Sequence, residues 1–296
     1  MTMSIGTVLL EPPESGLSEV ERSSTRLPFL NEADPAIQSF RFVARYDSMR
    51  LDTYRRGEHL GSRILTSRIG SALALRFDDV GYFNRVYCAD HNVFNKLPGI
   101  EDFYRGSPFG CELVGPPSDE SASVRISRTG WTPANRYAWL CHPDCGSLVC
   151  GQTTQFTIRP PRPSERQQFL LAYLRAFDAQ PDRIPSALRN MLHLFDRPEL
   201  HFLMAWHGDT LAGVAMMMRY DDTALLCAGA ALPEFREMGC HVALLAARIR
   251  LASSFGCRQL FSWAALGGQS QANMEKVGLE VVGSTTSWRY SPVARI

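Results

Sequence analysis

The sequence contains very little lysine: among its 31 basic residues only Lys96 and Lys276 are lysines, and the others are arginines. Such an excess of arginine is found in proteins that recognise phosphates or carboxylates, and it also results from the codon usage of a GC-rich genome. Neither sign of charge predominates, because 30 acidic residues leave a formal net charge of +1 at pH 7. The chain therefore lacks the overall positive field with which proteins hold nucleic acids or anionic membranes, and we expect neither partner.

Long apolar runs are absent as well. No run approaches the roughly 18 apolar residues of a membrane-spanning helix. The short apolar stretch at residues 5–10 has neither a basic flank nor a small-residue cleavage site, so we expect a cytoplasmic protein. In that compartment the eight cysteines are expected to be reduced thiols. Because the densest cluster, Cys141, His142, Cys145 and Cys150, contains no C-x-x-C pair, we expect no metal site.

The composition divides the 296 residues into three zones, and the length allows two medium domains. Residues 1–36 contain a Pro-Pro pair, several serines and glutamates, and a breaker at Asp34 and Pro35, which predict a flexible N-terminal tail. Residues 37–150 alternate helical spacing with short apolar strands, which predicts a first domain of the α/β or α+β class. Small residues then link this zone to a second domain, residues 151–296.

The second domain has the most regular pattern. Its expected order is strand, two helices, three strands, helix, strand, helix, and a final segment, 280–290, that can form two strands. The expected strands are 155–159, 200–207, 210–220, 223–232 and 257–265. The expected helices are 164–178, 186–195, a long apolar helix that opens with 234–241 and ends near 255, and 270–277.

The turn between the strand 223–232 and the long helix is the best candidate for a binding site. A helix N-terminus presents free backbone N–H groups and the positive end of a dipole, and both attract a phosphate. Gly239 allows a ligand to approach the backbone closely, and Arg236 adds a positive charge. An R-x-x-G sequence alone has little specificity, but here it lies directly between a strand and an apolar helix.

Two motifs make the second domain resemble a GCN5-related N-acetyltransferase (GNAT) domain. The pyrophosphate motif [Q/R]-x-x-G-x-[G/A] is matched from Arg236 to Cys240, and His241 replaces the usual glycine or alanine. The later segment S-x-x-N-x-x-[R/K]-x-G-F is matched at residues 270–278, with Leu279 in place of phenylalanine. The resemblance covers about half of the chain, and it implies a mixed central sheet flanked by helices.

The resemblance also implies acetyl-CoA as the donor substrate and the amine of a small molecule or an amino-acid-like molecule as the acceptor. The chain would then be an N-acetyltransferase. The alternative is a non-catalytic or regulatory CoA-binding protein, which the departure at His241 favours. The residues expected to contact CoA are Ala230, Ala231, Leu232, Arg236, Glu237, Met238, Gly239, Cys240, His241, Val242 and Asn273.

The acid–base groups are less evident. Many GNAT proteins carry a tyrosine where this chain has Met274, and the strand 223–232 contains no carboxylate. An amide near Leu232 is expected to stabilise the oxyanion. His241 has a suitable intrinsic pKa for a base, but its place in a helix's first turn favours a steric or capping role. Trp263 is a candidate for the wall of the acceptor pocket, and the candidate catalytic groups are Ser262, Tyr290 and Cys227.

The first domain resembles a degenerate copy of the same unit. Residues 108–141 follow the closing part of a GNAT fold, and residues 83–86 are similar to segments of bacterial tandem GNAT proteins. No R-x-x-G-x-G sequence precedes Pro108, so we expect no CoA site there. We expect the two domains to form a pseudo-dimer in which the first completes the acceptor cleft. The whole protein is expected to be a monomer or a homodimer.

Overall fold

A single mixed sheet of eleven strands runs through the computed structural model, which describes residues 34–56, 64–89, 93–115, 126, 129–142, 154–181 and 184–291. In the first half of the chain the strands are β1 (Ile64–Ile69), β2 (Ala72–Phe77), β3 (Arg85–Tyr87), β4 (Cys111–Val114) and β5 (Thr132–His142). In the second half they are β6 (Thr157–Arg159), β7 (Leu200–His207), β8 (Thr210–Tyr220), β9 (Thr223–Ala231), β10 (Gln259–Ala265) and β11 (Glu280–Tyr290).

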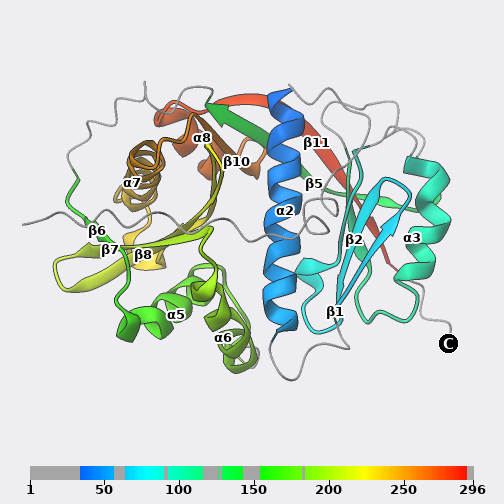
Figure 1. Cartoon of the computed structure of the whole chain (residues 1–296), viewed down its shortest axis with the longest axis horizontal. Helices are drawn as coiled ribbons and strands as arrows, with labels where there is room; N and C mark the ends of the chain where they lie inside the picture. The colour runs from blue at the N-terminus through cyan, green and yellow to red at the C-terminus, as the bar shows by residue number, and fades with distance from the viewer. Residues whose placement is uncertain are drawn as a thin grey trace, which may run out of the picture.

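The helices cover the sheet from different sides (Figure 1). They are α2 (Pro35–Arg55), α3 (Leu97–Phe103), α5 (Arg166–Ala176), α6 (Ile184–Leu192), α7 (Cys240–Ser254) and α8 (Gln269–Lys276). Helices α5 and α6 lie on one face of strands β7 to β9, and α7 and α8 lie on the other. Alternate residues of β7 show the reason, because Phe202 packs in the core on the α5 side and Leu203 in the core on the α7 side.

The same strand pattern occurs twice. Strands β1, β2 and β3 pair antiparallel and β3 pairs parallel with β4, while β7, β8 and β9 pair antiparallel and β9 pairs parallel with β10. A helix connects each parallel pair, α3 in the first half and α7 in the second. A parallel connection needs such a crossover, so each half contains one complete crossover unit. The expected boundaries at residues 36 and 150 stay a prediction.

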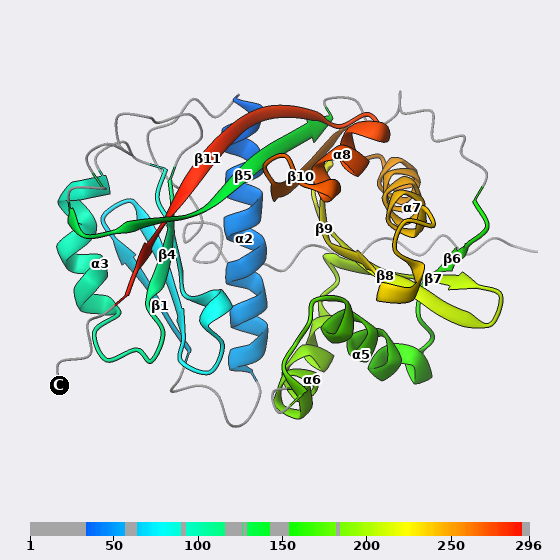
Figure 2. The ribbon, with the colours of Figure 1, turned by 180° about the vertical axis from the view of Figure 1, so that it is seen from behind.

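The two halves exchange strands at the centre of the sheet, where the order is β4, β11, β5, β10 (Figure 2). Strand β5 from the first half pairs with β10, and the final strand β11 pairs with β4. Residues 280–290 form one strand, so the expectation that they make two strands is wrong. Register shifts between Val281 and Gly283 and between Thr286 and Trp288 bend this strand, which continues without a turn.

Helix α2 packs between the two halves (Figure 1). Asp34 caps its first turn by accepting a hydrogen bond from the Ala36 amide at 2.8 Å, and Pro35 occupies the position where a missing N–H costs nothing. The helix therefore begins inside the segment expected to be a tail, whose residues 1–33 lie outside the described residues. Its Ser39 hydroxyl donates to the carbonyl of Ser262 in β10, which fixes the helix against the second half.

Membrane-spanning helices and metal-binding clusters were both considered from the sequence. Within the described residues, no helix combines the length and apolar character that crossing a membrane requires. No group of three or more histidine, cysteine or acidic side chains in the described part of the chain could hold a metal ion. Of the cysteine cluster, Cys141 is buried in β5, and Cys145 and Cys150 lie outside the described residues.

Candidate functional site

The turn before α7 has the backbone geometry of an anion site. Glu237 and Gly239 both have left-handed backbone conformations, with φ of 67° and 82°. The Gly239 carbonyl accepts the first helical bond, from the Ala243 amide, so the preceding N–H groups of the first turn have no partner within the helix. A Cβ at Gly239 would meet no atom within 4 Å, which shows that the turn is open on this side. Such turns collect N–H groups around an anion.

A depression of about 440 Å³ lies beside this turn. Val242, Ala246 and Arg250 line it from one face of α7, where they follow each other at intervals of four residues. Lys276, one of the two lysines of the sequence, lines it from α8. Because two cations face the same depression, its charge suits phosphate groups.

Strands β9 and β10 separate over the last residues of β9, the part that leads to this turn. Their parallel pairing ends at Leu225 and Phe261, so from residue 226 onward β9 has no strand partner on its β10 side among the described residues. On its other side β9 stays paired with β8, with a bulge next to Ala228, which has a φ of 46°. The separated stretch includes Ala230 and Ala231, and an extended ligand could pair with its free edge.

The backbone amide of Leu232 already has a hydrogen-bond partner in the protein. The Leu232 amide donates to the carbonyl of Ala212 at 2.8 Å, so it is not available to a ligand. Residue 232 is still paired with the neighbouring chain segment, although β9 itself ends at Ala231. This excludes the Leu232 amide itself, and the expectation of an oxyanion donor near it stays a prediction.

Arg248 extends from α7 into the bulge of β9. It is 1% exposed, and its Nη1 donates to the carbonyls of Met216 at 3.1 Å and Cys227 at 3.0 Å. Its Nη2 has no hydrogen-bond partner among the described residues, and a Cβ on Gly229 would lie only 2.5 Å from it. Burial lowers the pKa of Arg248 to about 10, so the group remains a cation at neutral pH. The bulge thus contains a buried positive charge.

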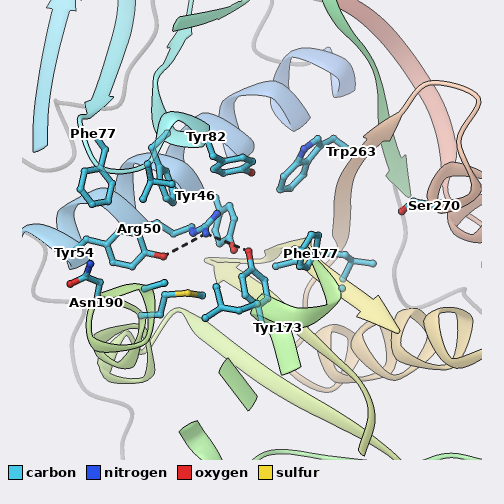
Figure 3. Close-up of a pocket in the computed structure, with 18 of the residues that line it drawn as sticks. Tyr46, Arg50, Tyr54, Phe77, Tyr82, Tyr173, Phe177, Asn190, Trp263 and Ser270 are labelled. Carbon is cyan, nitrogen blue, oxygen red and sulfur yellow. Dashed lines mark hydrogen bonds between the residues drawn. The ribbon is translucent and has the colours of Figure 1, made fainter. Parts of the chain in front are cut away.

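A second cavity, also of about 440 Å³, opens from the separated strands towards α2, α5 and α6; we call it the main cavity (Figure 3). Helix α2 contributes Tyr46, Arg50 and Tyr54, which its four-residue spacing places on one face. Other lining residues come from every surrounding element; among them are Phe77 and Tyr82 of the first half, Tyr173 and Phe177 at α5, Asn190 of α6, Trp263 of β10, and Ser270 and Met274 of α8. Both halves therefore line this cavity, and Trp263, the candidate for the wall of the acceptor pocket, is among its lining residues.

Arg50 lies at the centre of the main cavity wall (Figure 3). Its Nη2 donates to the hydroxyls of Tyr54 and Tyr173, each at 3.5 Å. Its guanidinium carbon lies 4.6 Å from the ring centroid of Phe83 and 5.1 Å from that of Tyr46. Aromatic faces at these distances attract a guanidinium, so the rings hold the side chain in place.

Two of the expected CoA residues, His241 and Asn273, meet between α7 and α8. The Nδ2 of Asn273 lies 3.2 Å from the Nδ1 of His241, and the Oδ1 of Asn273 accepts a hydrogen bond from Gln269. The His241 ring lines the main cavity. Burial and the charge of Arg248 lower the pKa of His241 to about 4, so the ring is neutral at neutral pH. It therefore cannot serve as a general acid there.

The three candidate catalytic groups have unfavourable positions. Cys227 is buried, and burial raises its thiol pKa to about 11. Ser262 is fully buried and its hydroxyl donates to the Leu226 carbonyl at 2.9 Å. Tyr290 stacks on Trp131 in the other half of the sheet. None of these three described residues lines the main cavity.

The charged and hydroxyl groups that line the main cavity were not among the residues predicted from the sequence. Arg50, Tyr46 and Tyr54 are on α2, for which the sequence predicted helical spacing and no site residue, and Arg248 is in the middle of the long apolar helix α7. A signal for the first three was present, because residues with polar groups at positions i, i+4 and i+8 share one face of a helix. A single arginine gives no such signal.

Comparison with known protein families gives a match in the second half of the chain. Residues 162–267 match the family model described as an acetyltransferase (GNAT) domain. No curated protein matches the sequence.

Solved structures with the same fold cover both halves of the chain. A conserved protein of unknown function from Staphylococcus epidermidis has a TM-score of 0.60 at 13% identity, over 80% of this chain and 97% of its own. A GCN5-related N-acetyltransferase from Kribbella flavida has a TM-score of 0.59 at 17% identity, over 84% of this chain and 95% of its own. A tandem GNAT protein from the clavulanic acid biosynthesis pathway has a TM-score of 0.51 at 11% identity, over 70% and 74%. The predicted GNAT fold, a mixed sheet flanked by helices, is confirmed.

Proposed function

Since the chain has the GNAT fold and carries a GNAT acetyltransferase domain, we propose that it is an N-acetyltransferase that uses acetyl-CoA and a small-molecule or amino-acid-like amine. The observation that carries this proposal is that three features adjoin: the open turn at Gly239, the edge of β9 that β10 leaves free, and the main cavity, whose lining includes Ala228 of β9 and His241 of α7. The phosphate end of a donor would bind at the turn, and its extended arm would lie along the free edge of β9. The acceptor would bind in the main cavity.

The donor site would be formed by the turn and its surroundings. The N–H groups at the start of α7 would bind the pyrophosphate, with Arg236 at the surface of the turn. Arg250 and Lys276 in the adjoining depression would bind further phosphate charge. Ala230 and Ala231 would pair with the pantetheine arm along the free edge of β9.

In the transfer itself, the acceptor nitrogen bonds to the acetyl carbonyl carbon, the C–S bond breaks, and one proton moves from nitrogen to sulfur. The described residues that line the main cavity include no aspartate or glutamate, so no carboxylate there would act as the base. Arg50 and Arg248 would instead lower the pKa of a bound ammonium group by repulsion, which favours the reactive neutral amine. Burial raises the pKa of the Tyr46 hydroxyl, so this group stays protonated at neutral pH and would donate a hydrogen bond to the leaving sulfur.

Calorimetric titration of the purified protein with acetyl-CoA and with CoA tests the donor site. We expect one-to-one binding of both, followed by release of CoA thiol when a suitable amine is added. Tight binding without thiol release for any amine would favour the alternative, a non-catalytic or regulatory CoA-binding protein. His241 is the observation that favours this alternative, because its ring fills space between α7 and α8. Absence of binding would contradict both functions.

The variant Gly239→Val tests the position of the donor site. A branched side chain here would cover the open face of the turn, so we expect binding of CoA to be lost. The left-handed backbone also makes the substitution cost about 1–2 kcal/mol of stability. Gly256→Val at the other end of α7 is the matched control, because Gly256 also has a positive φ, 73°, and open surroundings. Wild-type affinity in Gly239→Val, or an equal loss in the control, would contradict the assignment.

A further inference from the structure

The main cavity has a strongly asymmetric charge. Two buried guanidinium groups, Arg50 and Arg248, line it, and the described lining contains no acidic side chain. The nearest described acid to Arg50 is Asp47, whose Oδ1 lies 3.6 Å from Nη1. The other oxygen of Asp47 is held by the Tyr87 hydroxyl at 2.6 Å and by Arg85 at 3.1 Å. Asp47 is fully buried and does not line the cavity, so the charged side chains that a ligand could contact there are the two arginines.

Arg50 is also poorly satisfied as a hydrogen-bond donor. Its two bonds to tyrosine hydroxyls are 3.5 Å long, beyond the usual 2.7–3.2 Å for N–H···O. Its Nε has no partner among the described residues, although the residue is only 4% exposed. Buried guanidinium groups normally have short, charge-assisted bonds, often in pairs to one carboxylate. The ion pair with Asp47, at 3.6 Å, is too long to be such a bond, so Arg50 has no short charge-assisted hydrogen bond to an anion among the described residues.

From these two observations we infer that the acceptor is an aminocarboxylate whose carboxylate binds Arg50. This inference rests on the proposed acetyltransferase function and specifies its substrate class. The hydroxyls of Tyr54 and Tyr173 lie within reach of the same Nη2 and would donate to the carboxylate. Arg50 is thus the specificity-determining residue of the acceptor site.

The position of Arg50 assigns the carboxylate to the acceptor and not to the acyl group of the donor. Figure 3 shows Tyr54 and Asn190 at one end of the cavity and Ser270 of α8 at the other. The separated strands and α8 border the end where the thioester would enter. An acceptor whose carboxylate binds Arg50 would therefore extend along the cavity with its amine towards the end where the thioester enters.

The test compares pairs of acceptors that differ only in this charge. Thiol release from acetyl-CoA is measured with the twenty amino acids and with their carboxamides. Chemistry alone favours the amides, because their amines have lower pKa values and are more often neutral. We nevertheless expect kcat/KM to be at least tenfold higher for the free acids of the accepted amino acids, with the difference mainly in KM. Equal or faster reaction of the amides would overturn the inference and leave the proposed function intact.

A binding measurement decides the case in which acetyl-CoA binds but no amine of the panel reacts. Phenylacetate and phenylacetamide have the same shape, and they are titrated into the CoA-saturated protein. We expect phenylacetate to bind at least tenfold more tightly, and equal binding or none of either would overturn the inference. Faster reaction of neutral amines with succinyl-CoA than with acetyl-CoA would place the carboxylate on the donor, and would also overturn it. Lack of any acetyl-CoA binding would be a failure of the proposed function itself.

Variants then connect the preference to Arg50. Arg50→Gln and the milder Tyr173→Phe are expected to reduce the acid-to-amide ratio, the first by tenfold or more and the second by less. Arg55→Gln is the control, because Arg55 is an exposed arginine of the same helix whose bond to Thr66 is at the surface. If Arg50→Gln does not fold, Tyr173→Phe carries the test. An unchanged ratio in the folded variants would contradict the assignment.

Discussion

At the scale of single residues, His241 is the clearest departure from the GNAT motif. Its ring lies between α7 and α8, bonded to Asn273, and lines the main cavity. Burial among these groups favours the neutral ring, and the nearby charge of Arg248 adds to this preference. Because these surroundings disfavour the protonated ring of His241, they also make the free energy of unfolding depend on pH.

We expect the stability contributed by the neutral His241 to be lost as the pH falls from about 6.5 to about 4. The folded pKa of about 4 lies below the ordinary value of 6.5, so in this window the unfolded chain binds a proton that the folded chain does not. Each pKa unit corresponds to about 1.4 kcal/mol, which limits the effect to about 3 kcal/mol. Urea unfolding of the wild type and His241→Gln from pH 4 to 7 measures the difference.

In His241→Gln this pH-dependent component should disappear, so the gap in unfolding free energy between the two proteins should narrow towards pH 4. The control is His193→Gln, because the His193 side chain is 47% exposed on the surface. A gap that stays constant from pH 7 to pH 4 would show that the ring is not held neutral by its surroundings.

At the scale of elements, strand β11 connects the two halves and is closely fitted at its end. The residues on either side of β4 are both glycines, but their surroundings differ. A Cβ on Gly110 would collide with the backbone carbonyl of Tyr290 in β11, whereas a Cβ on Gly115 would meet no atom within 4 Å. Backbone atoms at a paired strand cannot move aside without disrupting the pairing.

Gly110→Ala should therefore destabilise the protein by about 2–4 kcal/mol, as expected for overpacking that displaces backbone. Gly115→Ala, at the opposite end of the same strand, should change the unfolding free energy by less than about 1 kcal/mol. Both values are measured by denaturant unfolding. Similar costs for the two variants would argue against the pairing of β11 with β4.

At the scale of the whole molecule, the strand exchange makes the two halves dependent on each other. Strand β5 pairs with β10 and β11 together, although it precedes both by more than a hundred residues. Without β5, one edge of β10 and one edge of β11 would present unpaired backbone groups. Helix α2 adds to the dependence, because Arg197 of the second half bonds to Thr53 at 2.7 Å and to Asp52.

We expect a fragment of residues 151–296 to be largely unfolded or aggregated when it is produced alone. The full chain should unfold in one cooperative transition, because neither half has a complete sheet. Circular dichroism, size-exclusion chromatography and thermal unfolding of fragment and full chain provide the measurement. A monomeric fragment with a sharp transition near that of the full chain would show that the second half folds independently.

The elements of the second half and the turn at Gly239 could be predicted from the sequence. Strands 210–220 and 223–231, the helix ending at Ser254 and the turn at Gly239 follow from local signals such as alternation, breakers and glycine. Strand β1 was not expected, because only its first residue is buried and alternation is therefore weak. The final strand was divided in two because a bulge leaves no clear signal in a sequence.

The sequence by itself determined the class of the fold, the family motif and the turn that would bind phosphate. Each depends on residues that are close together in the chain. Tertiary structure alone decided that β5 would lie between β10 and β11, that α2 would supply Arg50 to a cavity lined by both halves, and that Arg248 would fill the bulge of β9. These contacts join segments far apart in the chain, and they form because buried backbone groups and charges must find partners wherever the folded chain brings them.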